Sequence, residues 1–339
     1  MKLRPLLSLL RAGDLRARLR ALRDGQAGLR VAIIGSAIEL GVLDALRLRA
    51  LTSRELAEKI NVDDVTQLSA YLRVLESVGQ VSSDGDRWRL AKAGRAVLDD
   101  DLVHAAYQGF SGYHVNLYRD IRAQLGGGPP RRDIEEQGEV IARLSTAFEP
   151  FVARLLSDLV AQRRPRRVLD VGCGAGAQLI QMLSAAPGAQ GLGVETDADA
   201  AKLARSNLAA EGLAGRATVI EADVRDLLED QARIGGPVDL VLLANVIYYL
   251  PVDERAAFLK RVTGLLNPGG AVVVVSTVAS KSLTSRHFDL LLRAQQGEME
   301  LPRTDELLAQ LRQAGLTPGE PQRIAPGEPL LAVVAEMNA

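Results

Sequence analysis

The chain has 339 residues, of which 47% are hydrophobic and 24% charged, and its formal net charge is −1. This length favours about two domains and is ample for a buried core. The near-neutral charge argues against a protein that works mainly by coating nucleic acid, and the single cysteine excludes a disulfide framework. We expect a reducing, cytoplasmic setting. Aromatic residues (5 Phe, 1 Trp, 6 Tyr) and the 3 His are scarce, so any cluster of them is informative.

The amino-terminal segment is basic and rich in leucine. Residues 1–30 contain 8 Lys and Arg against 2 Asp. The sequence has no run of the about 20 apolar residues that cross a bilayer, and the segment lacks the features of a signal peptide. We expect an amphipathic helical arm whose leucines pack on a partner subunit. The alternative is contact with an acidic partner, such as a carrier protein, a membrane surface or nucleic acid.

Residues 31–100 predict a small helical module that ends in a β-hairpin. Residues 52–55 have the pattern of a capping box, which opens a short helix. Apolar residues from Val65 to Val78 recur every three or four positions and predict a second helix that ends at Gly79. Residues 81–90 then turn through Asp84 and Gly85, a hairpin signal. The order of helix, helix and hairpin resembles a winged helix.

The charge of this winged-helix-like module does not favour DNA binding. Residues 51–100 contain 7 Lys and Arg against 9 Asp and Glu, and the second helix offers only Arg73 as a basic residue. Binding to phosphates requires clustered positive charge. We therefore predict that residues 1–100 form a dimerisation domain.

The scarce aromatic and histidine side chains gather in residues 101–162, a helical linker interrupted by the loop 126–130. A spacing of three and four residues places Tyr107, Phe110 and His114 on one helical face. One interpretation is an aromatic stripe that packs between domains, and the other is the lining of a small-molecule pocket. The residues that we predict to bind substrate here are Tyr107, Phe110, Tyr113, His114 and Tyr118; His104 accompanies them in the cluster.

From residue 163 onward strands and helices alternate, which predicts a parallel sheet covered by helices on both faces. The expected strands are residues 167–171, 191–195, 217–221, 238–243, 271–276 and 330–336. A glycine-rich turn follows the first of them and contains Gly172, Gly174 and Gly176. Glycines suit a tight turn that a ligand approaches closely. Because Gly172, Gly174 and Ala177 also satisfy the dinucleotide fingerprint, the turn alone leaves a dehydrogenase open.

Three features further along the chain favour a different class of protein over a dehydrogenase. Asp223 closes the third strand, the fourth strand runs into Asn245 and the pair Tyr248-Tyr249, and residues 267–270 form a turn before a β-branched fifth strand. With the glycine turn, this set resembles the class I S-adenosylmethionine-dependent methyltransferases over residues 165–280. With the preceding module, the whole chain resembles the dimeric small-molecule O-methyltransferase family. The resemblance implies an α/β fold with a doubly wound, mostly parallel, seven-stranded Rossmann-like sheet in residues 163–339.

The resemblance also implies a cofactor site for S-adenosylmethionine, whose product is S-adenosylhomocysteine. Gly172, Gly174 and Gly176 would flank the methionine part and the ribose, and Asp170 would orient the amino-acid end. Glu195 would bind the ribose hydroxyls, Asp223 and the backbone of Val224 would hold adenine, and Asn245 would complete the site. The alternative for the acids is that they cap the following helices. Cys173 is interpreted as a packing residue, and no metal site is predicted.

The family often places a histidine base after the fourth strand, at the position of Tyr248 in this chain. A tyrosine with a pKa near ~10 is a poor base at neutral pH. The acceptor would then need little deprotonation, or His114 or His287 would reach the site from another segment, or the fold would perform other chemistry. Candidate catalytic residues are Tyr248, His114 and His287, with Tyr249 as a substrate-binding residue.

The resemblance therefore implies a homodimeric methyltransferase, here without the usual histidine base. The expected acceptor is a small aromatic or polyketide-like secondary metabolite, methylated on oxygen. The alternatives are C- or N-methylation on the same scaffold, and a regulatory DNA-binding protein without catalysis.

Overall fold

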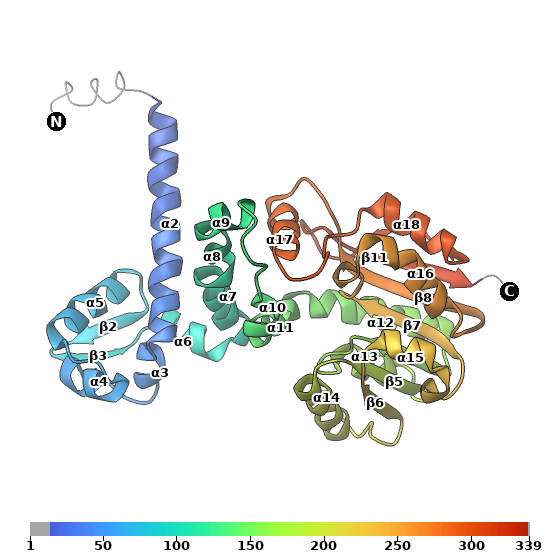
Figure 1. Ribbon diagram of the computed structural model, residues 1–339. Helices are drawn as coiled ribbons and strands as arrows, with labels where there is room; N and C mark the ends of the chain where they lie inside the picture. Colours follow the sequence, from blue (N-terminus) through green and yellow to red (C-terminus); the bar gives the residue numbers. More distant parts are fainter. Residues whose placement is uncertain (1–13, 338–339) are drawn as a thin grey trace. The chain divides into compact units, whose positions relative to one another are not determined.

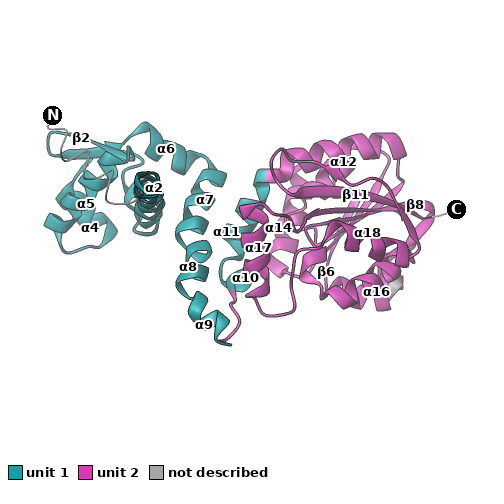
Figure 2. Ribbon diagram, turned by 90° about the horizontal axis from the view of Figure 1, so that it is seen from above, with its two compact units in different colours: residues 1–128, 133–147 teal, residues 129–132, 148–339 magenta. Residues whose placement is uncertain are grey.

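The computed structural model describes residues 14–337, which divide into two compact units (Figure 1). Figure 2 colours unit 1, which runs to residue 128 and includes residues 133–147, and unit 2, which comprises residues 129–132 and everything from residue 148. The predicted linker, residues 101–162, is thus shared between the units. The division into residues 1–100, 101–162 and 163–339 by role stays a prediction. Residues 1–13 of the basic arm lie outside the described residues.

Unit 1 is mainly helical, with one small antiparallel sheet. Its elements are α2 (Leu15–Glu39), α3 (Val42–Ala45), β1 (Leu51–Thr52), α4 (Ser53–Ile60), α5 (Val65–Ser77), β2 (Val81–Asp84), β3 (Arg87–Leu90), α6 (Lys92–Asp99), α7 (Asp101–Ser111), α8 (Tyr113–Arg119), α9 (Ile121–Leu125), α10 (Asp133–Glu136) and α11 (Gly138–Ser145). The short η1 (Thr146–Phe148) follows at the boundary with unit 2.

Local sequence signals explain the helix–helix–hairpin module. The Thr52 hydroxyl accepts from the backbone N–H of Glu55, and the Glu55 carboxylate accepts from the N–H of Thr52, so the predicted capping box opens α4. Gly79, with φ of +78°, follows the end of α5. The hairpin β2–β3 pairs Val81 with Leu90 and turns at Gly85, as predicted. The strand β1, which pairs with β3, was missed because two residues carry no periodicity.

The aromatic cluster does not lie on one continuous helix. Gly112, with φ of −99° and ψ of −114°, separates α7 from α8, so the expectation of a single helical face through Tyr107, Phe110 and His114 is wrong. The rings of Phe110 and His114 nevertheless stack, with centroids 4.7 Å apart. An added Cβ on Gly109 would meet Leu144 at 2.8 Å, so this glycine permits close packing inside unit 1.

Unit 2 is an α/β sandwich with helices on both faces of one sheet. Its helices are α12 (Glu149–Arg163), α13 (Ala177–Ala185), α14 (Ala198–Ala210), α15 (Val224–Glu229), η2 (Gln231–Ile234), η3 (Ile247–Tyr249), α16 (Val252–Thr263), α17 (Leu283–Arg293) and α18 (Thr304–Gln313). Its strands are β4 (Arg167–Val171), β5 (Gln190–Glu195), β6 (Ala217–Glu221), β7 (Val238–Ala244), β8 (Leu266–Thr277), β9 (Leu316–Pro318), β10 (Gln322–Arg323) and β11 (Leu330–Met337).

The sheet has the predicted, mostly parallel arrangement. Its order is β10-β11-β8-β7-β4-β5-β6, seven strands, with β9 as an eighth that pairs with β11. The strands β4 to β8 run parallel, and β11 joins β8 antiparallel. The order changes direction at β4, whose neighbours are β5 on one side and β7 on the other. A ligand site is therefore expected beyond the carboxyl ends of these strands.

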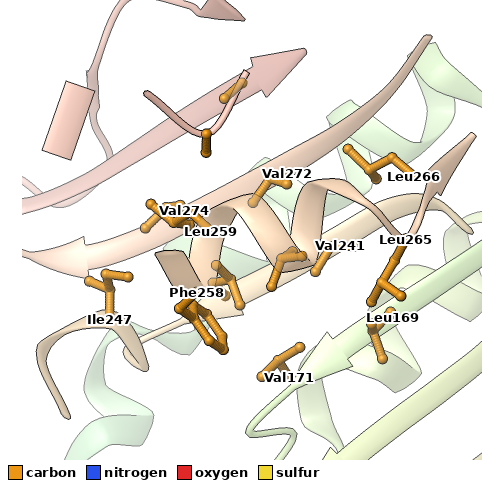
Figure 3. Packing of buried hydrophobic residues seen from close by; sticks show 14 of the residues in the cluster. Leu169, Val171, Val241, Ile247, Phe258, Leu259, Leu265, Leu266, Val272 and Val274 are labelled. Carbon is orange, nitrogen blue, oxygen red and sulfur yellow. The ribbon is translucent and has the colours of Figure 1, made fainter. Parts of the chain in front are cut away.

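Two apolar layers hold this sheet. Figure 3 shows part of one of them, in which Val241 and Val272 of the strands face Phe258 and Leu259 of α16. The other layer joins α12, α13 and α14 to the opposite face, through residues such as Leu156. Within residues 14–337, no helix is both long and apolar enough to cross a membrane.

Candidate active site

The predicted cofactor residues lie where β4, β5, β6 and β7 end. Asp170 is on β4, and the glycine turn follows this strand directly. Glu195 closes β5, Asp223 follows β6, and Asn245 follows β7. Because these strands are adjacent and parallel, the four acidic and amide side chains share one edge of the sheet.

The glycine turn has a backbone that only glycine adopts easily. Gly172, Gly174 and Gly176 have φ of +68°, +51° and +86°. A Cβ on Gly172 would come within 2.8 Å of Val246, whereas a Cβ on Gly174 would meet no atom within 4 Å. The turn therefore leaves open space over Gly174, which a ligand could approach.

Glu195 ties this turn to the following strand. One of its carboxylate oxygens accepts from the N–H of Gly174 at 2.8 Å. The other accepts from the N–H groups of Thr196 and Asp197 at 2.8 and 3.0 Å. Asp197, rather than Glu195, caps α14 through the N–H of Ala200.

Asp170 is the most buried acid of the site, with 1% of its surface exposed. Burial, together with the nearby negative charge of Glu195, raises the pKa of its carboxyl to about 8. A hydrogen bond from the backbone N–H of Leu179 opposes this rise, and the second oxygen, Oδ2, has no partner. An orphaned buried oxygen at a strand end suits a cationic ligand group.

Asp223 is held by Arg225 and keeps its charge. Its carboxylate accepts from the Arg225 side chain at 2.6 Å and from the Arg225 N–H at 2.8 Å, so it also caps α15. These bonds to Arg225 hold the pKa of Asp223 below its usual range. The capping alternative thus describes Asp223 in the structure. Asp223 also lies beside Val224, just after the end of β6. The predicted contact of these two residues with adenine stays a proposal.

Tyr248 and Tyr249 follow β7 in η3. Their ring centroids are 4.7 Å apart, and Tyr248 donates a hydrogen bond to Tyr249. Burial raises the pKa of both phenols, that of Tyr248 most strongly, so both are neutral at physiological pH. The Tyr248 ring packs edge-on against Phe288 of α17 at 5.4 Å. A neutral, buried phenol is a poor base, and the role of Tyr248 in catalysis stays a prediction.

Comparison with known proteins assigns a domain type to the strands and turns that carry these residues. Residues 168–270, from β4 into β8, match a family model described as a methyltransferase domain. This stretch is a methyltransferase domain, and unit 2 has the fold of the class I S-adenosylmethionine-dependent methyltransferases. The matched stretch contains the glycine turn, Glu195, Asp223 and Tyr248. The residues present fit the cofactor of this class, because the glycine turn leaves open space over Gly174 and the buried carboxyl of Asp170, on the strand before the turn, lacks a partner at Oδ2.

Relatives of the methyltransferase are distant. It is 26% identical over 247 residues to indolepyruvate C-methyltransferase of Streptomyces griseus, covering 72% of this chain and 71% of that protein. It is also 26% identical to 3-hydroxy-5-methyl-1-naphthoate 3-O-methyltransferase of Streptomyces sahachiroi, covering 70% and 71%. Other curated methyltransferases match over 78 to 131 residues, and the chain spans only 15% to 46% of their length.

Solved structures share the fold of both units. A structure of mitomycin 7-O-methyltransferase superposes with a TM-score of 0.77 at 21% identity, covering 97% of this methyltransferase and 99% of that chain. An O-methyltransferase family protein from Burkholderia thailandensis gives a TM-score of 0.72 at 21% identity, covering 95% and 98%.

The remaining predicted residues fall into two groups. His287 lies on α17 of unit 2, half-buried, and burial lowers its pKa, so the imidazole is neutral. Unit 1 holds Tyr107, Phe110, Tyr113, His114 and Tyr118. Tyr107 packs against the core of that unit, Tyr113 is buried, and Phe110 and Tyr118 are about half exposed. Packing of Tyr107 inside unit 1 tests neither interpretation, the stripe between domains or the pocket lining. The roles of all these residues stay predictions.

Sequence reasoning missed Arg255, a fully buried residue of α16. Its Nε donates to the carbonyl of Leu250, at the end of η3, and one terminal nitrogen donates to the carbonyl of Glu300 at 2.6 Å. Arg255 therefore joins the tyrosine turn to the loop that carries Leu301, which packs on Tyr248. An arginine among the acidic residues of α16 looks like a surface charge in the sequence, and no local signal predicts its burial.

The described part of the chain contains no group of three or more His, Cys, Asp or Glu that could hold a metal ion. Cys173 is a buried free thiol inside the glycine turn, and burial raises its pKa. It is therefore a packing residue of the methyltransferase rather than a nucleophile.

Proposed function

We propose that the methyltransferase transfers a methyl group from S-adenosylmethionine to a small aromatic or polyketide-like secondary metabolite. The proposed acceptor atom is an oxygen, and the reaction uses no histidine base. The observation that carries the proposal is the glycine turn after β4 with carboxylates at the ends of β5 and β6. The named activities of the two Streptomyces relatives, on a naphthoate oxygen and on a carbon of indolepyruvate, support both the acceptor class and C-methylation as the second candidate.

The site residues divide the work between the two ends of the cofactor. The backbone of the glycine turn, together with Asp170 and Glu195, is proposed to hold the methionine and ribose parts, and Asp223 with Val224 the adenine. The cofactor supplies an electrophilic methyl on a sulfonium. The enzyme then has to place an acceptor atom in line with that methyl in a site without water, and such positioning provides much of the rate. Neutral tyrosines suit an acceptor that is already nucleophilic.

Two experiments test this proposal. Calorimetry should detect binding of both S-adenosylmethionine and S-adenosylhomocysteine, and failure of both to bind would contradict it. A metabolite-library assay, read by a mass gain of one methyl group, should then identify the acceptor and the methylated atom. A library in which no compound gains a methyl group would favour a non-catalytic protein.

Tyr248→Phe should change kcat by no more than about threefold. A general base contributes about 10²- to 10⁴-fold, whereas the Tyr248 hydroxyl is neutral and donates to Tyr249. The measurement is kcat with the acceptor found in the library. His287→Gln tests the other candidate base of unit 2 in the same assay. A loss of a hundredfold or more in Tyr248→Phe would mean that the phenol takes part in proton transfer.

We further propose that the protein is a homodimer, associated through the winged-helix-like unit 1. Leu19, Leu22 and Leu29 of α2 are more than half exposed and recur with the spacing of a helical seam. Contiguous exposed leucines of this kind are typical of an interface. The acidic balance of residues 51–100 argues against a DNA-binding role. A free buried thiol as the only cysteine supports a reducing, cytoplasmic setting.

Leu22→Glu should convert the dimer into a monomer. Leu22 is 67% exposed in the middle of the α2 stripe, and a carboxylate buried at its place in an interface would be costly. Light scattering during size-exclusion chromatography gives the mass of each form. The control is Leu48→Glu, at a position that is 89% exposed and outside the stripe, and it should remain dimeric. A Leu22→Glu protein that stays dimeric would place the interface elsewhere.

A further inference from the structure

The carboxyl of Asp170 sits in an environment that does not suit a negative charge. Only 1% of the residue is exposed, and its Oδ2 accepts no hydrogen bond. The carboxylate of Glu195, at the end of the adjacent strand, adds a second negative charge nearby. Burying an ionised carboxylate without full hydrogen bonding is costly, so the group takes up a proton instead.

The groups that interact with Asp170 come from three elements, β5, α13 and the glycine turn. From β5 comes Glu195, and from α13 the backbone N–H of Leu179, which is the single donor to the carboxyl that opposes protonation. The turn contributes Cys173, whose thiol is neutral because burial raises its pKa. The positive charge of Arg205 in α14 opposes the rise in the pKa of Cys173. The Nε of Arg205 donates a hydrogen bond to the carbonyl of Val219. Burial and Glu195 outweigh the one opposing hydrogen bond, and they raise the pKa of Asp170 to about 8.

Glu195 has the backbone donors that Asp170 largely lacks. Its two oxygens accept from three backbone N–H groups, of Gly174, Thr196 and Asp197. Hydrogen bonds to a carboxylate favour its charged form. The donors that stabilise a negative charge at this end of the sheet are therefore directed mainly at Glu195, whereas Asp170 has one donor and an unpartnered Oδ2.

We propose that Asp170 is protonated at neutral pH in the cofactor-free protein and releases its proton when the positively charged methionine end of the cofactor binds. The inference rests on the proposed function, because it takes Asp170 as the group that meets the amino-acid end. An ammonium group beside the carboxyl supplies the partner that Oδ2 lacks and favours the ionised form. The proton passes to the buffer, so binding of the cofactor and loss of one proton are linked.

The affinity for the cofactor is expected to depend on pH. Below a pH of about 8 most of the cofactor-free protein must lose a proton before the ion pair forms, so affinity should rise with pH. The limit is about tenfold in Kd per pH unit, for one proton released. The window for measurement is pH 6.0 to 7.5, in which the amino group of the ligand is itself still mostly protonated.

The experiment is calorimetry of the full chain with S-adenosylhomocysteine at pH 7.0 in three buffers that differ in their enthalpy of ionisation. The dependence of the observed enthalpy on the buffer gives the number of protons released. We expect about one proton per ligand bound, and a Kd that tightens by up to about tenfold from pH 6 to pH 7. Binding with no proton released, and with a Kd independent of pH, overturns the inference. Absence of binding overturns the proposed function instead.

Two variants assign the proton. Asp170→Asn keeps the size of the protonated side chain but cannot ionise, so it should bind more weakly and release no proton. Asp223→Asn is the matched control, because Arg225 already keeps Asp223 ionised. It should also bind more weakly, yet release as many protons as the unmodified protein. Proton release that persists in Asp170→Asn overturns the assignment, and the wild-type pH series tests the linkage without any variant.

Discussion

Gly174→Ala is expected to weaken binding of S-adenosylmethionine by about 10- to 200-fold, the range for one misplaced methyl group in a fitted pocket. The added Cβ meets no protein atom within 4 Å. It therefore projects into the open space in which the methionine and ribose parts of the cofactor are proposed to bind. The positive φ of +51° adds a backbone cost of about 1–2 kcal/mol to the folded protein. Calorimetry of ligand binding and thermal unfolding of the variant separate the two effects.

Gly212→Ala is the matched control for Gly174→Ala. Gly212 also has a positive φ, +71°, and also has open space at its Cβ position, so the cost to stability should be similar. It lies in the turn between α14 and β6, at the end of the sheet opposite the glycine turn. Its affinity for the cofactor should therefore equal that of the unmodified protein. Equal losses of affinity in both variants would show that backbone strain, and not contact with the ligand, is responsible.

Phe258→Ala is expected to lower the free energy of unfolding of unit 2 by about 3–5 kcal/mol. The ring is 2% exposed and lies in the apolar layer between α16 and the sheet (Figure 3). Its removal leaves a cavity among strands that cannot close over it without moving α16. Denaturant titration, with hydrogen exchange to resolve the two units, measures the change.

The control for Phe258→Ala is Leu203→Ala on α14, where the side chain is 51% exposed. Its effect should stay within about 0.5 kcal/mol. Hydrogen exchange of the Leu56 and Leu72 region in unit 1 should be unchanged in both variants, since that unit has a core of its own. Equal destabilisation of both units by Phe258→Ala would mean that they unfold as one.

The sequence predicts the strands of unit 2 well because the central ones, β4, β7 and the second half of β8, are buried along most of their length. β4 and β6 begin and end at the predicted residues, and the alternation of strands and helices leaves a parallel sheet as the simple arrangement. β8 is longer than predicted, since Leu266 already pairs with Val238 and a bulge absorbs the turn at residues 267–270. The short strands β9 and β10 were missed, because their pairing with β11 depends on partners far along the chain.

The candidate site was predictable where backbone geometry demands a residue type, and not where a side chain depends on tertiary packing. The positive φ angles of the glycine turn leave a clear mark in the sequence. The bonds of Arg225 to Asp223 and of Arg255 to Leu250 leave none, because both arginines look like ordinary helix surface charges. The helix break at Gly112 was also missed, since the aromatic spacing continues across it.

The hydrogen bonds of Glu195 mean that the turn has its shape before the cofactor arrives. A glycine-rich segment loses much conformational freedom when it becomes ordered, and that loss would otherwise weaken binding. Here the N–H of Gly174 donates to Glu195, and Asn207 donates to the carbonyl of Ala175. The turn therefore loses its conformational entropy when the protein folds and not when the cofactor binds. Association with the cofactor should consequently be fast and limited by encounter, with little rearrangement of the turn.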